Sequence, residues 1–134
     1  MIVVRRKPLQ GCLRFVVVEA EDLVNSRKGK CNTFCKVSMG SQEERTGVIS
    51  GTDCPMWDSS MQFQVKDLQE DTLCITVFDK GYYSPDEFLG RAEIRVADIM
   101  VHWSYGPIQK RLKLHEVEKG VVVLKLDLRL FGNP

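Results

Sequence analysis

The stretch Val121–Leu130, which reads Val-Val-Val-Leu-Lys-Leu-Asp-Leu-Arg-Leu, decides the fold. Large aliphatic residues occupy every second position from Val122 to Leu130, and the positions between them become charged from Lys125 onwards. Side chains two residues apart in a β-strand point to the same face of the sheet. The alternation therefore predicts a strand that is buried on one face only.

Shorter segments with alternating apolar residues precede this strand and are separated from one another by turn residues. We expect strands at residues 12–19, 33–39, 45–49, 61–65, 73–79, 92–96 and 108–114. A turn around Ala97-Asp98-Ile99 is the single helical candidate. About eight short strands with little helical periodicity predict an all-β fold, an eight-stranded antiparallel β-sandwich.

Length and charge limit the functional classes. The 134 residues are enough for one domain with its own core. The 19 basic and 18 acidic residues give a net charge of +1, which argues against a strongly basic nucleic-acid-binding protein. Apolar runs are too short to span a membrane, and Arg5, Arg6 and Lys7 follow the apolar start in the wrong order for a secretion signal. The five scattered cysteines favour a reduced, cytoplasmic protein over a disulfide framework.

Enzyme signatures are absent from the sequence, so we expect no catalytic residues. It contains no nucleophile elbow, phosphate-binding glycine loop or zinc-protease helix. The two histidines, His102 and His115, are interpreted as ordinary surface residues. Cys31 and Cys35 are interpreted as strand residues rather than zinc ligands, because a structural zinc site needs a second such pair.

Three loops, at residues 25–32, 50–60 and 79–87, carry most of the remaining information. Short motifs lie within and between these loops and in the strand before them, in the order Gly11–Leu13, Ala20–Leu23, Asn32–Val37, Cys54–Asp58, Met61–Phe63, Val77–Asp79 and Asp86–Gly90. Together they resemble the motifs of C2 domains, over residues 11–131, with residues 1–10 as a leader and 132–134 as a tail. The resemblance is strongest to the C-terminal C2 domain of intersectins, on the stretches at residues 73–78, 89–99, 114–117 and 126–131.

The resemblance implies a sandwich whose three loops at one end hold calcium and touch phospholipid. In intersectins this domain follows a nucleotide-exchange module within an endocytic scaffold. The family pattern supplies five acidic calcium ligands and an assisting serine. Those positions fall here near Arg27 or Ser26, and on Asn32, Asp79, Gly81 and Glu87, with Ser84 in the place of the serine.

Only two of the five acidic ligands remain, whereas calcium requires six to eight oxygen ligands. A cation such as Arg27 about 5 Å from the ion costs ~3 kcal/mol at an effective dielectric constant of about 40. That cost corresponds to roughly a hundredfold loss of affinity. We therefore expect no required cofactor, and at most a weak residual calcium site at Asp79, Ser84 and Glu87, with Asp86 as a further candidate.

The basic residues of the first loop have two interpretations. Arg27, Lys28 and Lys30 are either a solvated loop without a role or fixed positive charge that attracts anionic lipid without calcium. Tyr82 and Tyr83 either pack on the end of the sandwich or anchor it in the headgroup layer.

We expect a non-enzymatic module that associates weakly with an anionic membrane surface and needs little calcium. The alternative is a protein-docking module that positions a neighbouring exchange domain. Nucleic acid is not an expected partner. Trp57 and Phe63 are expected to be core or loop-supporting residues, whereas the role of Trp103 stays open.

Overall fold

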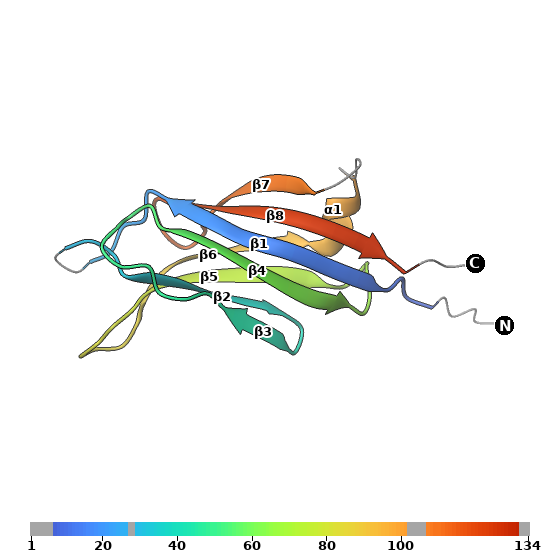
Figure 1. Cartoon of the computed structure of the whole chain (residues 1–134), viewed down its shortest axis with the longest axis horizontal. Helices are drawn as coiled ribbons and strands as arrows, with labels where there is room; N and C mark the ends of the chain where they lie inside the picture. The colour runs from blue at the N-terminus through green and yellow to red at the C-terminus, as the bar shows by residue number, and fades with distance from the viewer. Residues whose placement is uncertain (1–6, 27–28, 102–106, 132–134) are drawn as a thin grey trace.

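The computed structural model describes residues 7–26, 29–101 and 107–131. They form two four-stranded antiparallel sheets packed face to face, with one short helix at the edge (Figure 1). The expected eight-stranded antiparallel β-sandwich is therefore confirmed. The elements are β1 (Gly11–Glu21), β2 (Thr33–Met39), β3 (Gln42–Arg45), β4 (Met56–Val65), β5 (Thr72–Asp79), β6 (Glu87–Arg95), α1 (Val96–Val101), β7 (Ile108–Lys113) and β8 (Val121–Leu130).

The first sheet has the order β4-β1-β8-β7, and the second has the order β3-β2-β5-β6. Strand β8 therefore lies beside β1, although the two are far apart in the sequence. Their register pairs Leu13 with Leu128 and Phe15 with Leu126, so that the aliphatic stripe of β8 meets the apolar side of β1. Both stripes face the second sheet, and this arrangement creates a single core.

The core confirms the pattern read in the last strand. Leu124 and Leu126 are completely or almost completely buried, whereas Leu130, at the end of the stripe, is only partly buried. The rings of Phe15 and Phe63 pack at a centroid distance of 5.2 Å, which is typical of a favourable aromatic pair. Phe63 is thus a core residue, as expected.

The bounds of several strands were predicted wrongly. Strand β4 begins at Met56 and β6 at Glu87, each five residues earlier than expected, so the expected loop at residues 50–60 ends at Pro55. The third strand is Gln42–Arg45 rather than residues 45–49, because Gly40, at φ +59°, closes a tight turn and Gln42 pairs at once with Met39. This edge strand is polar and exposed, so it carries no apolar alternation. Residues 46–50 form no regular strand, but Thr46 exchanges hydrogen bonds with Cys35, and Ile49 forms an isolated bridge with Thr33. Val96 begins helix α1 instead of ending β6.

Side-chain and backbone contacts link the two sheets along both open sides. On one side, the amide of Gln42 donates to the carbonyl oxygen of Gln64 at 2.8 Å and accepts from its N–H at 2.7 Å. On the other side, the backbones of Arg91 and His115 form an isolated antiparallel bridge. Both sheets are therefore fixed relative to each other, which gives their connecting loops a rigid base.

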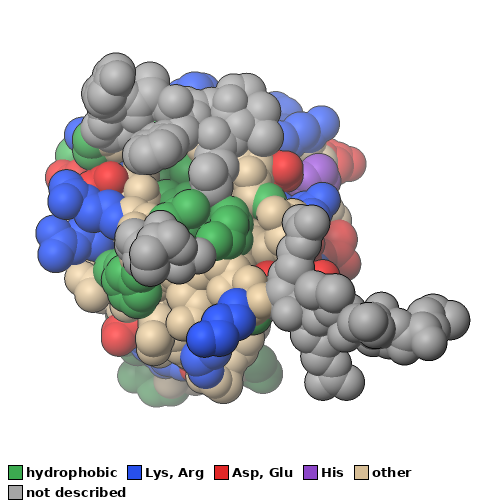
Figure 2. Space-filling model, turned by 90° about the vertical axis from the view of Figure 1, so that its right-hand side faces the viewer, with side chains coloured by type: hydrophobic (Ala, Val, Ile, Leu, Met, Phe, Trp, Pro, Cys, Tyr) green, Lys and Arg blue, Asp and Glu red, His purple; other side chains and the backbone are tan. Residues whose placement is uncertain are grey.

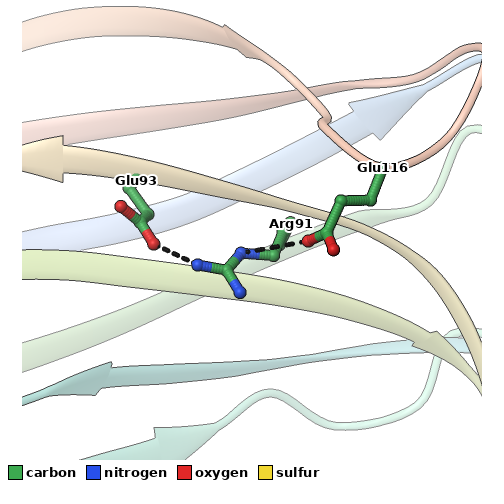
Figure 3. Close-up of polar contacts among 3 residues, drawn as sticks. All are labelled: Arg91, Glu93 and Glu116. Carbon is green, nitrogen blue, oxygen red and sulfur yellow. Dashed lines mark hydrogen bonds and ion pairs between the residues drawn. The ribbon is translucent and has the colours of Figure 1, made fainter.

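The guanidinium group of Arg91 strengthens the second link. It lies between the carboxylates of Glu93 and Glu116, on strand β6 and on the β7–β8 turn respectively (Figure 3). The three side chains are about half exposed, so solvent screening leaves each ion pair little net stabilisation. His115 is exposed, in agreement with a surface histidine, and His102 and Trp103 lie outside the described residues.

The described ends of the chain lie together at one end of the sandwich, and the long loops lie at the other (Figure 1). A backbone hydrogen bond from Phe131 N–H to the carbonyl of Gln10 joins the two termini at this end. Among the described residues, none of the helices is long and apolar enough to cross a membrane.

Candidate functional site

Three loops meet at the end of the sandwich opposite the termini, on the left of Figure 1. We call them loop 1 (residues 22–32, between β1 and β2), loop 2 (residues 46–55, between β3 and β4) and loop 3 (residues 80–86, between β5 and β6). Their sequences carry the candidate residues named above.

Loop 1 begins with a sharp turn of the backbone. Asp22 has φ +57°, a left-handed conformation that aspartate tolerates better than most residues. The turn brings Leu23 back into the core, where it is 3% exposed. The N–H of Leu23 then donates to the carbonyl oxygen of Asp53 in loop 2 at 3.2 Å. The sequence Ala20–Leu23 thus anchors the start of the loop.

Loop 1 and loop 2 are also joined at the far end of loop 1. Asp53 accepts a hydrogen bond from the N–H of Cys31 at 3.2 Å, and Asn32 accepts one from Gly51 at 3.1 Å. Burial, reinforced by the nearby Asp53 carboxylate, raises the pKa of the Cys31 thiol to about 12. The indole N–H of Trp57 donates to the carbonyl of Thr33 at 3.1 Å, so Trp57 supports the loops as expected.

Loop 1 and loop 3 are held together by a set of hydrogen bonds that we call the latch (Asn25, Ser26, Asn32, Asp79 and Glu87). The carboxylate of Asp79 is only 2% exposed. It accepts one hydrogen bond from the backbone N–H of Asn32 and one from the side-chain amide of Asn25, both at 2.9 Å. The first loop thus supplies hydrogen-bond donors to a buried anion.

The second half of the latch involves Glu87, the other acidic residue expected at the residual calcium site. Glu87, at the start of β6, accepts hydrogen bonds from the backbone N–H of Ser26 at 2.9 Å and from its hydroxyl at 3.0 Å. These bonds join the start of β6 to loop 1. The sequence placed Asp79 and Glu87 correctly beside loop 1, but it did not indicate that Asn25 and Ser26 would bind them.

The other two residues considered for calcium lie within loop 3. Asp86 accepts a hydrogen bond from the N–H of Gly81 at 2.9 Å and forms an ion pair with Lys80 at 3.8 Å. Ser84 is exposed. Within the described part of the chain, no group of three or more His, Cys, Asp or Glu side chains is arranged to hold a metal ion.

The expected membrane-binding residues that can be placed lie on the surface of this end. Lys30 is exposed in loop 1, Tyr82 is 66% exposed and Tyr83 is fully exposed in loop 3. Both tyrosine side chains project largely into solvent. Arg27 and Lys28 lie outside the described residues.

Two further apolar residues at this end were missed by the sequence reasoning. Val24 in loop 1 is 61% exposed, and Val48 in loop 2 is 40% exposed. Each valine stands beside another aliphatic residue, Leu23 and Ile49 respectively, and the sequence did not indicate which member of each pair would face solvent. With Tyr82 and Tyr83 they form what we call the apolar crown, which places at least one exposed apolar side chain on each loop.

A family model described as C2 domain matches residues 11–112. The chain belongs to the C2 domain family. It is 50% identical over 126 residues to intersectin-1 of Homo sapiens and of Xenopus laevis, a match that covers 92% of this chain. It is 46% identical over 123 residues to intersectin-2 of Mus musculus, covering 90% of this chain. The chain spans about 7% of the length of these relatives.

Solved C2 structures have the same architecture. A structure of two C2 domains of extended synaptotagmin 2 superposes with a TM-score of 0.81 and 26% sequence identity, over 96% of this chain and 44% of that chain. A single C2 domain of a plant extended synaptotagmin 1 gives the same TM-score at 20% identity, over 96% of this chain and all of that chain. The second likeness shows the fold alone.

Proposed function

We propose that this C2 domain is a non-catalytic module that associates weakly with anionic phospholipid membranes through its three loops, largely without calcium. As the resemblance to intersectins implies, it would serve as one part of a cytoplasmic endocytic scaffold that also carries nucleotide-exchange activity. The single observation that carries the proposal is the apolar crown together with exposed Lys30, at the end away from the termini.

The latch supports independence from calcium. In a C2 domain that binds calcium, the ion bridges acidic residues of loops 1 and 3. Here Asn25 and Ser26 contribute neutral hydrogen-bond donors to Asp79 and Glu87, and these donors already hold the two loops together. Calcium would have to displace these bonds without carboxylates at the positions of Asn32 and Gly81. Among the residues that the structure describes, no third acidic side chain joins Asp79 and Glu87 in a group that could hold a metal ion.

The interaction is expected to be weak. Each basic residue near an anionic surface contributes about 1 kcal/mol, so that Arg27, Lys28 and Lys30 together contribute ~3 kcal/mol. This is less than the ~4 kcal/mol of a millimolar complex. The exposed tyrosines add interfacial affinity, since their rings suit the headgroup layer. In a longer protein, a second membrane-binding module would raise the apparent affinity through effective concentration.

Sedimentation with lipid vesicles tests the proposal. The domain should bind vesicles that contain phosphatidylserine but not vesicles of phosphatidylcholine alone, and excess chelator should leave binding unchanged. Binding should fall steeply with salt, because the Debye length shrinks from about 10 Å at 0.1 M to about 3 Å at 1 M. Binding that disappears in chelator would contradict the proposal.

Charge reversal locates the binding surface. The triple variant Arg27→Glu, Lys28→Glu and Lys30→Glu should lose binding, while its stability should change by less than about 0.5 kcal/mol per substitution. The matched control reverses three exposed cations at the end that carries the termini, namely Lys7, Lys66 and Arg95. If the loop variant binds as well as the parent, the membrane surface is not at the loops.

A second candidate function is protein docking at the terminal end. Leu9 is 43% exposed and Phe131 is 55% exposed there, and Figure 2 shows hydrophobic side chains among Lys and Arg side chains on this end. A neighbouring exchange domain is the partner that the resemblance implies. The double variant Leu9→Ser and Phe131→Ser should then weaken binding of that exchange domain in titration calorimetry, whereas the charge-reversed loop variant should not.

A further inference from the structure

Loop 3 contains a dipeptide that occurs nowhere else in the chain. Five prolines are present, and Pro85 is the only one that follows a serine or threonine. The other four follow Lys7, Cys54, Gly106 and Asn133. A kinase that requires proline directly after the acceptor hydroxyl would therefore find a single acceptor in this sequence, at Ser84.

The structure makes this acceptor accessible. Ser84 and Pro85 are exposed, and loop 3 projects from the body of the sandwich at the lower left of Figure 1. Within the described residues, the hydroxyl of Ser84 makes no hydrogen bond that a kinase would have to break. The bond that closes the loop, from Gly81 N–H to Asp86, lies at the base of the loop. The acceptor therefore lies on an exposed loop, outside the paired strands β5 and β6.

We propose that Ser84 is a phosphorylation site for a proline-directed serine/threonine kinase, and that the phosphate releases the loop end from anionic membranes. In the reaction, Ser84 Oγ bonds to the γ-phosphorus of a nucleoside triphosphate. The bond from that phosphorus to the β,γ-bridging oxygen breaks, the hydroxyl proton passes to a base of the kinase, and a nucleoside diphosphate leaves. The regulatory part of the proposal rests on the proposed membrane function.

The phosphate changes the charge at the centre of the proposed contact. It adds about −1.5 to −2 charges at pH 7, next to Tyr83 and two residues before Asp86. This negative charge opposes the attraction that the basic residues of loop 1 exert on an anionic surface. At about 1 kcal/mol for each charge near the membrane, the loss is roughly thirtyfold in vesicle partition, which corresponds to ~2 kcal/mol.

The experiment treats the folded 134-residue chain with a proline-directed kinase and ATP and locates the phosphate by mass spectrometry of peptides. We expect one phosphate, at Ser84, which is lost in Ser84→Ala and strongly reduced in Pro85→Ala. Partition on phosphatidylserine vesicles is then measured for treated and mock-treated chain. Treatment should lower the partition of the parent about thirtyfold and leave the partition of Ser84→Ala unaffected.

A matched pair of substitutions tests whether the position of the added negative charge matters, and not only the change in net charge. Ser84→Glu should lower partition about fivefold, and Ser41→Glu, in the exposed β2–β3 turn at the opposite end, should not. Phosphate that enters only after unfolding refutes the site, and phosphorylation with unchanged partition refutes the switch. An unmodified chain that fails to bind vesicles refutes the proposed function instead, because incorporation at Ser84 is measured without lipid.

Discussion

The latch predicts that the side-chain amide of Asn25 stabilises the loop end. It also predicts that a carboxylate in place of this amide makes the stability of the protein dependent on calcium. Asn25→Ala removes one of the two hydrogen bonds described to the carboxylate of Asp79, which is 2% exposed. A hydrogen bond to a charged group contributes about 1.5–3 kcal/mol, and the partial exposure of Asn25 favours the lower part of that range. With an unfolding entropy of about 0.28 kcal/mol/K for a chain of this length, the melting temperature should fall by about 5–7 °C.

Asn25→Asp replaces the amide that donates to Asp79 by a carboxylate, so that two carboxylates face each other. Two like charges about 4 Å apart cost ~2 kcal/mol at an effective dielectric constant of about 40. The free energy of unfolding in chelator should therefore fall by about 4 kcal/mol in total. The variant also has a third carboxylate beside Asp79 and Glu87, so calcium should now bind. Calcium at a hundred times its dissociation constant restores about 2.7 kcal/mol.

Urea unfolding and thermal melts in chelator and in millimolar calcium measure both effects. The parent should show no clear rise in melting temperature at sub-millimolar calcium. Gln109→Glu, which changes an exposed amide of β7 to a carboxylate, is the matched control and should respond to neither condition. If Asn25→Asp is as stable as the parent in chelator, or gains nothing from calcium, the latch does not take the place of an ion.

Further predictions concern the sandwich beneath the loops. Gly11→Ala should lower stability by about 1–3 kcal/mol in urea unfolding, because a Cβ would lie 2.3 Å from the carbonyl oxygen of Arg129. Gly47→Ala, which has open space, should not. Cys54 is exposed and should react with a thiol reagent in the folded protein, whereas Cys31 should react only on unfolding. Since the pKa of Cys31 is raised from 9.0 to about 12, its contribution to stability is present below pH 9 and lost as the pH rises towards 12, which unfolding curves across that range would show.

The fold could be predicted from residues whose burial follows a simple period. The stripe from Val122 to Leu128 is buried as the alternation required, and Lys125, on the opposite face of the strand, is exposed. The position of the edge strand β3 was not predicted correctly, because its burial follows no such period. It lies at the margin of its sheet, both faces are largely solvated, and its sequence Gln-Glu-Glu-Arg carries no period.

The sequence indicated the acidic residues of the candidate site but not the hydrogen bonds that they accept. The acidic positions Asp79 and Glu87 were identified because the motifs around them have fixed spacing. Asn25 and Ser26 are ordinary loop residues, and their role arises only because loop 1 folds back over loop 3. The exposure of Val24 was equally invisible, since whether an apolar loop residue turns inward depends on the fold of the whole loop.

The position of the termini has a consequence for whatever is joined to them. Strand β1 has 11 residues, and at about 3.3 Å for each residue the sandwich is roughly 35 Å long. With the loops on a bilayer, a partner attached at the other end would stand about four Debye lengths away at physiological salt. The electrostatic interaction between the partner's charges and the lipid headgroups would therefore be almost completely screened. The domain would then act as a rigid spacer, which sets the distance between its neighbour and the membrane independently of that neighbour's charge.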